Sequence, residues 1–260
     1  MKKLDIYEEL VSKGEYVERD VYQKLVLWKK ESAREHIGLF LKGSRRVGKT
    51  VLALALAHQE YRSHIIISFL NASEETKKLF VNGLENLDEF YTILEVTFGE
   101  KLYPGESLII LDEVQLFPQA RMALKTLLED GRYDFIETGS LAGINRSKSK
   151  ILNPGDEDEL EIFPISFIEY LRLKNEESMI ELLEKVLKKP TPLYSSLPRI
   201  MHRFREYILV GGMPQSLVCF LKTGDFEKCD KIKRRINNLY LTDEDDEENV
   251  GSSLQYPPSR

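Results

Sequence analysis

Residues that build covalent or metal cross-links are scarce in this sequence. The 260 residues include two cysteines, Cys219 and Cys229, which are too few and too far apart for a CxxC metal site or a disulfide framework. We therefore expect reduced thiols. The histidines show no metal-ligand spacing and are expected at ordinary surface or core positions; they are His36, His58, His64 and His202.

Long apolar runs and an excess of positive charge are also missing. No segment approaches the roughly 20 apolar residues that cross a bilayer, and Met1–Asp5 carries charge where a signal peptide needs an apolar run. These absences predict a cytoplasmic protein with no membrane partner. The formal net charge of −6, from 37 basic and 43 acidic residues, gives no bulk electrostatic argument for nucleic acid.

The sequence instead has a globular composition and an alternating order of apolar runs and helical stretches. With 42% hydrophobic and 31% charged residues, the chain is long enough for one large domain or two small ones. Short apolar runs predict five strands, at 39–41, 65–69, 108–111, 134–138 and 160–163. Because helical stretches separate these runs, the pattern predicts βαβ units and a parallel sheet, an α/β fold.

Composition divides the chain into four stretches. Helix formers dominate the N-terminus, the α/β pattern follows, the character becomes charged and helical after Pro164, and the last residues are acidic and then contain Gly, Ser and Pro. The expected parts are an N-terminal helical segment at 1–36, the α/β core at 37–165, a helical lid or the start of a second domain at 166–240, and an acidic flexible tail at 241–260.

A glycine-rich loop follows the first predicted strand. Gly43–Thr50 matches G-x-x-x-x-G-K-[ST], the P-loop pattern, at every fixed position. Glycines let the N–H groups of such a loop converge on a phosphate, and the helix that follows adds its positive end. We expect Lys49 to neutralise phosphate oxygens and the Thr50 hydroxyl to bind Mg²⁺. The residues expected at the nucleotide are Gly43, Ser44, Arg45, Arg46, Val47, Gly48, Lys49, Thr50 and Val51.

The pattern does not require the two arginines of this loop. Arg45 and Arg46 are either solvated cations near a phosphate site or contacts to a neighbouring subunit or a carboxylate. The sequence leaves both interpretations open.

A pair of carboxylates follows another predicted strand. Leu108–Leu111 is apolar and leads directly into Asp112 and Glu113, the arrangement of a Walker B motif with a following glutamate. Carboxylates at the C-terminal ends of parallel strands face the crevice where nucleotides bind. We therefore expect Asp112 to support Mg²⁺ and Glu113 to act as the general base toward the attacking water.

Two further polar positions lie near these carboxylates. Thr138-Gly139-Ser140 closes the next predicted strand, and a hydroxyl there either contacts the γ-phosphate and orients the water, as a sensor does, or caps a helix. We include Ser140 among the candidate catalytic residues, with Thr138 as its alternative. Gln115 either controls Glu113 through a hydrogen bond or serves as a cap.

With these motifs in place, the chain resembles the AAA-type ATPases of archaea and bacteria that carry a C-terminal domain of unknown function. The resemblance spans about residues 20 to 220. Its matching features, in order, are Trp28, Arg45–Thr50, Leu111–Gln115, Lys125, Thr138–Ser140, Pro164–Glu169 and Gly211–Pro214.

The resemblance implies a three-layer fold with a five-stranded parallel sheet in the order 5-1-4-3-2, followed by a small helical region. It implies ATP and Mg²⁺ as ligands, an unidentified protein or nucleic-acid client, and a homo-oligomer as one arrangement that relatives adopt. The chain departs from the pattern in two ways. It stops soon after Tyr240, where relatives continue into a second domain, and Ser147–Asp158 is polar and acidic where relatives carry a Gly-Arg pair.

Two function classes follow. The first is an ATPase in which Lys49, Glu113 and Ser140 act on the phosphates and the water, while Thr50 and Asp112 hold Mg²⁺. The second is a nucleotide-dependent switch, or binding module, with negligible turnover. A small-molecule kinase is disfavoured because the sequence shows no acceptor pocket.

Overall fold

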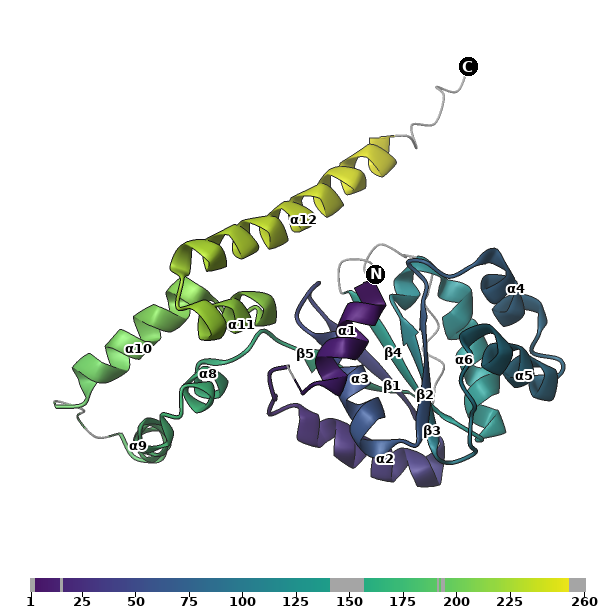
Figure 1. The fold of residues 1–260 in the computed structure, drawn as a ribbon, viewed down its shortest axis with the longest axis horizontal. Helices are drawn as coiled ribbons and strands as arrows, with labels where there is room; N and C mark the ends of the chain where they lie inside the picture. The colour runs from purple at the N-terminus through teal and green to yellow at the C-terminus, as the bar shows by residue number, and fades with distance from the viewer. Residues whose placement is uncertain (1–2, 15, 141–156, 191, 193–194, 253–260) are drawn as a thin grey trace, which may run out of the picture. The chain divides into compact units, whose positions relative to one another are not determined.

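The chain folds into two compact units. The computed structural model describes residues 3–14, 16–140, 157–190, 192 and 195–252, and the units divide between Phe163 and Pro164. Figure 1 shows the strands in the first unit and helices throughout the second. The N-terminal segment expected at 1–36 belongs to the first unit, because Val11, Leu25 and Trp28 are buried in the same core as the strands.

The first unit is built on a five-stranded parallel sheet with the order β2-β3-β4-β1-β5. Read from the other edge, this is the order 5-1-4-3-2, so the expected topology is confirmed. The strands are β1 (Gly38–Gly43), β2 (Ser63–Ser68), β3 (Ser107–Asp112), β4 (Asp134–Ser140) and β5 (Glu157–Ile162).

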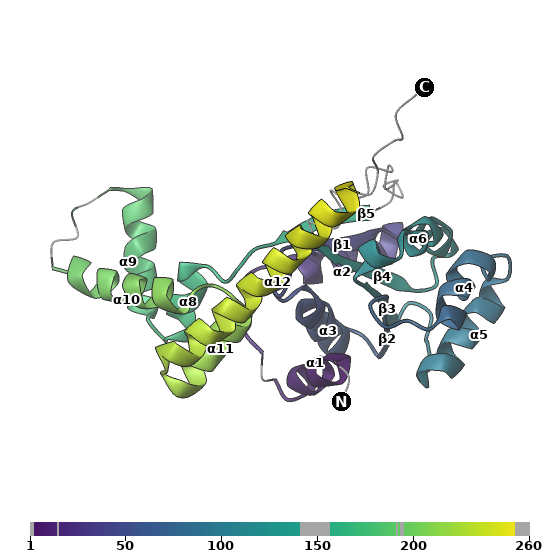
Figure 2. The same ribbon diagram turned by 90° about the horizontal axis from the view of Figure 1, so that it is seen from above.

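Helices cover both faces of this sheet, which makes three layers (Figure 2). On one face, α1 (Lys3–Ser12), α2 (Tyr22–Glu35) and α3 (Lys49–Glu60) contribute to one hydrophobic cluster. On the other, α4 (Glu74–Asn82), α5 (Leu87–Phe98) and α6 (Pro118–Asp130) contribute to a second. The strands of a sheet buried in this way are apolar on both sides; in β1, Leu39 and Leu41 face the first cluster and Phe40 the second.

Strand β5, at one edge of the sheet, differs most from its expected position. It begins at Glu157, three residues before the apolar run expected at 160–163, and ends at Ile162. This strand pairs with β1 alone and carries exposed glutamates, so it lacks the continuous apolar pattern of a central strand.

The second unit is helical over its described residues. Its helices are α8 (Phe167–Leu173), α9 (Glu177–Lys188), α10 (Leu197–Val210), α11 (Pro214–Thr223) and α12 (Phe226–Ser252). Leu171, Met179, Ile180 and Ile200 form a core within it. The Ser166 side chain and Glu169 form a capping box that starts α8.

Two distant sequence motifs meet in this unit. The Ile165 N–H donates to the Gly212 carbonyl at 2.8 Å, and the Tyr207 hydroxyl donates to the Ile165 carbonyl at 2.7 Å. A Cβ at Gly212 would lie 2.6 Å from the Ile165 carbonyl oxygen. This close approach explains why a glycine stands in the turn between α10 and α11.

Helix α12 continues to Ser252, beyond the boundary expected at residue 240. The tail expected at 241–260 therefore begins with helical turns, because the acidic run at 243–248 contains no proline and no glycine. Among the described residues, no helix is both long enough and apolar enough to cross a membrane.

Candidate nucleotide site

The glycine-rich loop connects β1 to α3, and two of its glycines are required by geometry. Gly48 caps α3 with φ 105°, a conformation that other residues rarely adopt. A Cβ at Gly43 would lie 2.4 Å from the Ile162 carbonyl oxygen of the neighbouring strand β5. Both positions therefore require glycine, and the N-terminus of α3 lies at the end of the loop.

Lys49 lies inside this loop. Its Nζ donates to the carbonyl oxygens of Gly43 and Ser44, each at 2.9 Å. The side chain is 6% exposed, so the ammonium group is buried and held by backbone acceptors. A buried cation at the N-terminus of a helix is suited to binding an anion such as a phosphate.

The remaining loop residues surround this position. Val47 is fully buried in the core beside the sheet, while Ser44, Arg45 and Arg46 are half-buried. Arg46 has φ 63°, which places it in the left-handed region. Val51 is half-buried in the first turn of α3.

Asp112, at the end of β3, joins the loop to the sheet. Its Oδ1 accepts hydrogen bonds from the Thr50 hydroxyl at 2.7 Å and from the Thr138 hydroxyl at 2.8 Å. Its Oδ2 accepts one from the Ser68 hydroxyl at 3.1 Å. The two predicted metal ligands, Thr50 and Asp112, are thus in contact.

Ser68 was missed by the sequence interpretation, which included it in an apolar strand. The signal was its position, because it is the polar residue that ends β2 and pairs in register with Asp112 of β3. Polar residues at the C-terminal ends of adjacent parallel strands lie at the same edge of the sheet.

Glu113 has a strained backbone. Its φ is 58°, a value that is uncommon for a residue with a side chain. The Glu113 N–H donates to the Thr138 hydroxyl at 3.2 Å, and the Gln115 amide donates to the Glu113 carboxylate. The hydrogen bond expected for a controlling role of Gln115 is therefore present, and Thr138 contacts both carboxylate residues.

Ser140 ends β4 beside the loop. It is buried and pairs in register with Gly43 of β1. Because side chains alternate along a strand, Ser140 and Thr138 project from the same face of β4. On this face of β4, the Thr138 hydroxyl donates to Asp112.

The donor atoms fit Mg²⁺. A hydroxyl and a carboxylate are hard oxygen ligands of the kind that Mg²⁺ prefers, and Mg²⁺ is usually held by one or two carboxylates together with substrate phosphates. Thr50 and Asp112 supply such a pair beside the buried ammonium group of Lys49.

Two of the histidines lie together in the structure, although their spacing in the sequence did not indicate a metal site. His58 and His64 both contact Glu8, and the three side chains form a cluster with metal-binding potential. Sequence spacing missed it because its third member comes from α1, far away in the chain. His36 and His202 are not in this cluster.

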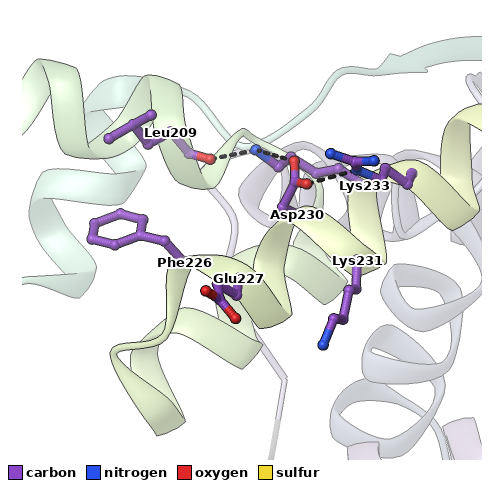
Figure 3. Close-up of a pocket in the computed structure, with 7 residues that line it drawn as sticks. Leu209, Phe226, Glu227, Asp230, Lys231 and Lys233 are labelled. Atoms are coloured by element: carbon purple, nitrogen blue, oxygen red, sulfur yellow. Dashed lines mark hydrogen bonds and ion pairs between the residues drawn. The ribbon is translucent and has the colours of Figure 1, made fainter.

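The second unit has a hollow of about 500 Å³ between the end of α10 and the first turns of α12. Figure 3 shows Lys233 donating to the carbonyl of Leu209 and lying close to Asp230. The residues that line it include no glycine, so the hollow lacks the phosphate-binding pattern of the first unit.

Comparison with curated proteins finds sequence relatives that match much of this chain. An uncharacterized protein of Methanocaldococcus jannaschii is 27% identical over 248 residues, which cover 92% of this chain and 47% of that protein. An uncharacterized protein of Haemophilus influenzae is 28% identical over 178 residues, covering 67% of this chain and 38% of that protein. The chain thus spans half or less of the length of these curated relatives.

Solved structures with a similar fold include AMPPCP-bound DnaA from Aquifex aeolicus. The similarity has a TM-score of 0.47 with 14% identity and covers 87% of this chain and 69% of that chain. The C. elegans PCH-2 structure has a TM-score of 0.46 with 11% identity and covers 90% and 72%. The sequence model of the AAA domain family matches residues 36–171, more than half of the chain, and the chain therefore belongs to this family of AAA domains.

Proposed function

We propose that this chain binds ATP with Mg²⁺ at the Gly43–Thr50 loop and hydrolyses the terminal phosphoanhydride bond. The observation that carries the proposal is the set of contacts at Asp112. The Asp112 carboxylate accepts hydrogen bonds from the Thr50 hydroxyl of the loop and from the Thr138 hydroxyl of β4, and Glu113 is the next residue in the chain. Metal ligand, loop and candidate base are thereby fixed relative to one another.

Each residue has a role that its position supports. Lys49 stabilises the negative charge of the phosphate oxygens, and Thr50 and Asp112 hold Mg²⁺, which supplies further neutralisation of the phosphates when it is bound. Glu113 accepts a proton as the water oxygen bonds to the γ-phosphorus and the bond from that phosphorus to the bridging oxygen breaks. Ser140 or Thr138 contacts the γ-phosphate at the end of β4.

The strained backbone at Glu113 supports its role as general base. Residues held in uncommon backbone conformations cost about 1–3 kcal/mol and are concentrated at functional sites. Here the strain turns the chain directly after β3, and the Thr138 hydroxyl accepts the Glu113 N–H. The backbone is therefore held in place independently of a ligand.

A second candidate function is a nucleotide-dependent switch with negligible turnover. The observation in its favour is the hydrogen bond from the Gln115 amide to the Glu113 carboxylate, which occupies a carboxylate oxygen that would otherwise accept a proton from the attacking water. In this state an ATP-bound chain would present a different surface from the empty chain without hydrolysing ATP.

Nucleotide binding and turnover separate the proposals. ATP binding by isothermal titration is expected to be Mg²⁺-dependent and to be lost in Lys49→Ala, whereas Lys231→Ala, an exposed lysine of α12, is the matched control. Steady turnover near 1 s⁻¹ supports the ATPase, while turnover at or below about 10⁻³ s⁻¹ with intact binding supports the switch. Equal ATP binding by Lys49→Ala and wild type would contradict both.

A further inference from the structure

Three elements of the first unit bring two imidazoles and one carboxylate together, away from the glycine-rich loop. Glu8 comes from α1, His58 from the last turn of α3 and His64 from β2. His58 Nε2 lies 2.7 Å from Glu8 Oε2, and His64 Nε2 lies 2.9 Å from Glu8 Oε1. The two imidazole rings meet edge to face with centroids 4.9 Å apart.

Glu8 and His64 are half-buried and His58 is exposed, with side-chain exposed fractions of 31% for Glu8 and His58 and 17% for His64. They are thus held in place by their surroundings but open to an ion from solvent. Burial raises the pKa of Glu8, but the hydrogen bonds from His64 and His58 outweigh this effect and bring the pKa below its usual value.

The location also favours a cation. His58 lies in the last turn of α3, where the carbonyl groups at the end of the helix give a partial negative charge. The same helix begins at the glycine-rich loop, where its positive end points toward the phosphate position. Since a helix rises about 1.5 Å per residue, His58 is displaced along the axis by about 13 Å from Lys49.

We propose that Glu8, His58 and His64 form a binding site for a divalent transition-metal cation of the Zn²⁺ class. Two imidazole nitrogens and one carboxylate oxygen are a recurring Zn²⁺ donor set, with solvent or another ligand completing the tetrahedron. All three donor atoms lie within 4.8 Å of one another.

Binding of the ion would change the spacing of the three ligand atoms. Metal bonds of about 2.0–2.1 Å in a tetrahedron place neighbouring ligand atoms about 3.3 Å apart. His58 and His64 contact different oxygens of Glu8, so a single oxygen ligand would open one of the two nitrogen–oxygen distances, 2.7 or 2.9 Å, to about 3.3 Å. The donor atoms, which lie within 4.8 Å of one another, would draw together to this spacing.

The bound ion would fasten α1 to the core. Glu8 is the ligand from α1, whereas His58 and His64 flank the turn between α3 and β2. Metal binding that requires the folded arrangement stabilises that arrangement. We therefore expect Zn²⁺ to raise the thermal stability of the first unit without taking part in the phosphate chemistry.

The experiment is a metal titration of the full chain after treatment with a chelator, without nucleotide. Zn²⁺ is titrated by calorimetry, and Co²⁺ is titrated by visible absorption, which distinguishes four-coordinate from hexaaquo ions. One Zn²⁺ per chain is expected, with a rise in melting temperature and a four-coordinate Co²⁺ spectrum. His58→Ala, His64→Ala and Glu8→Gln are each expected to weaken binding by at least about 100-fold, beyond the roughly 10–100-fold cost of losing an outer partner.

Three control variants separate this site from other donors. His202→Ala removes an exposed histidine of the second unit, Cys219→Ser removes a thiol, and Asp112→Asn removes the carboxylate of the nucleotide site. All three are expected to keep the Zn²⁺ site. Glu8→Gln, which keeps a hydrogen-bonding side chain of the same size, serves if a histidine variant fails to fold.

Two results would overturn the proposal. One is an absence of saturable Zn²⁺ binding by the wild-type chain, which would leave Glu8, His58 and His64 as a hydrogen-bonded cluster only. The other is a Zn²⁺ affinity unchanged in folded Glu8→Gln and His64→Ala, or lost in Cys219→Ser or Asp112→Asn, which would place the ion elsewhere.

Discussion

The Asp112 carboxylate accepts hydrogen bonds from three hydroxyl groups that come from three parts of the chain. Thr50 and Thr138 donate to its Oδ1, and Ser68 donates to its Oδ2. Hydrogen bonds to an ionised acceptor are about twice as strong as neutral ones, so these contacts fix the loop against the edge of the sheet. Under the proposed function, this arrangement presents the metal ligands in place before ATP binds.

Thr138 is the residue whose removal tests this arrangement most cleanly. Thr138→Val keeps the shape of the side chain but leaves Asp112 one donor short and the Glu113 N–H without its acceptor. An unpaired buried polar group costs about 1–3 kcal/mol, so ATP turnover is expected to fall about 10-fold or more. Thr138→Ser keeps the hydroxyl and should keep most of the turnover in the same steady-state assay; equal rates in both variants would argue against a role for the hydroxyl.

At the residue scale, sequence motifs predicted the positions that chemistry restricts most. The phosphate-loop pattern predicted Thr50, and the carboxylate at the end of a strand predicted Asp112. In the structure the Thr50 hydroxyl lies 2.7 Å from the Asp112 Oδ1. Ser68 carries no motif, and its role depends on the register between β2 and β3. The cluster of Glu8 with His58 and His64 depends on how α1 packs, which spacing along the chain does not encode.

Arg121, Glu137 and Glu157 form a buried cluster of ionisable side chains that has no role in the proposed nucleotide site. Arg121 of α6 lies 2.9 Å from the Glu137 carboxylate of β4, contacts Glu157 of β5, and stacks on the Phe40 ring at 4.4 Å. Burial raises the pKa of Glu137 well above its usual range, and the nearby Glu157 raises it further against the attraction of Arg121. Burial also raises the pKa of Glu157.

This group predicts a pH dependence of stability. Because the pKa of Glu137 is higher in the folded than in the unfolded chain, the folded chain binds more protons between the two values. The contribution of Glu137 to the free energy of unfolding is therefore fully present below the unfolded pKa, near 4.5, and is lost as the pH rises toward the pKa of the folded chain. In Glu137→Gln, the free energy of unfolding should fall less steeply with rising pH than in the wild type, by up to about 1.4 kcal/mol per pH unit.

Urea denaturation at a series of pH values from 4.5 upward measures this difference. Glu161→Gln, at an exposed position of the same strand as Glu157, is the matched control and should follow the wild-type curve. Parallel curves for wild type and Glu137→Gln would show that the carboxylate does not titrate differently on folding.

The contact between β1 and β5 depends on the absence of a side chain at Gly43. Gly43→Ala would place a Cβ 2.4 Å from the Ile162 carbonyl, a backbone atom that moves only if the edge strand moves. Gly99→Ala provides a control, because Gly99 has φ 68° with open space at the Cβ position. Gly99→Ala should cost about 1–2 kcal/mol for its backbone conformation, and Gly43→Ala should cost more in urea denaturation; equal costs would exclude the steric explanation.

At the scale of the whole molecule, the sequence predicted the parts that periodicity determines. The five strands and the helical character after Pro164 are present, and so is the strand order, which the family resemblance implied. The predicted start of β5 was too late, because Glu157 and its neighbours at the edge of the sheet are polar and give no apolar run. The N-terminal helices were not recognised as part of the first unit, because burial of Trp28 against the sheet is a tertiary contact that composition does not show.

The central claim is that the first unit hydrolyses ATP with Glu113 as base, and Mg²⁺-dependent phosphate release by wild type and Glu113→Gln tests it most directly. The account predicts that Glu113→Gln binds ATP with wild-type affinity and that its turnover falls by about 10²–10⁴-fold, the usual contribution of a general base. Glu129→Gln, an exposed glutamate of α6, should keep wild-type turnover. Undiminished phosphate release by Glu113→Gln would contradict the account.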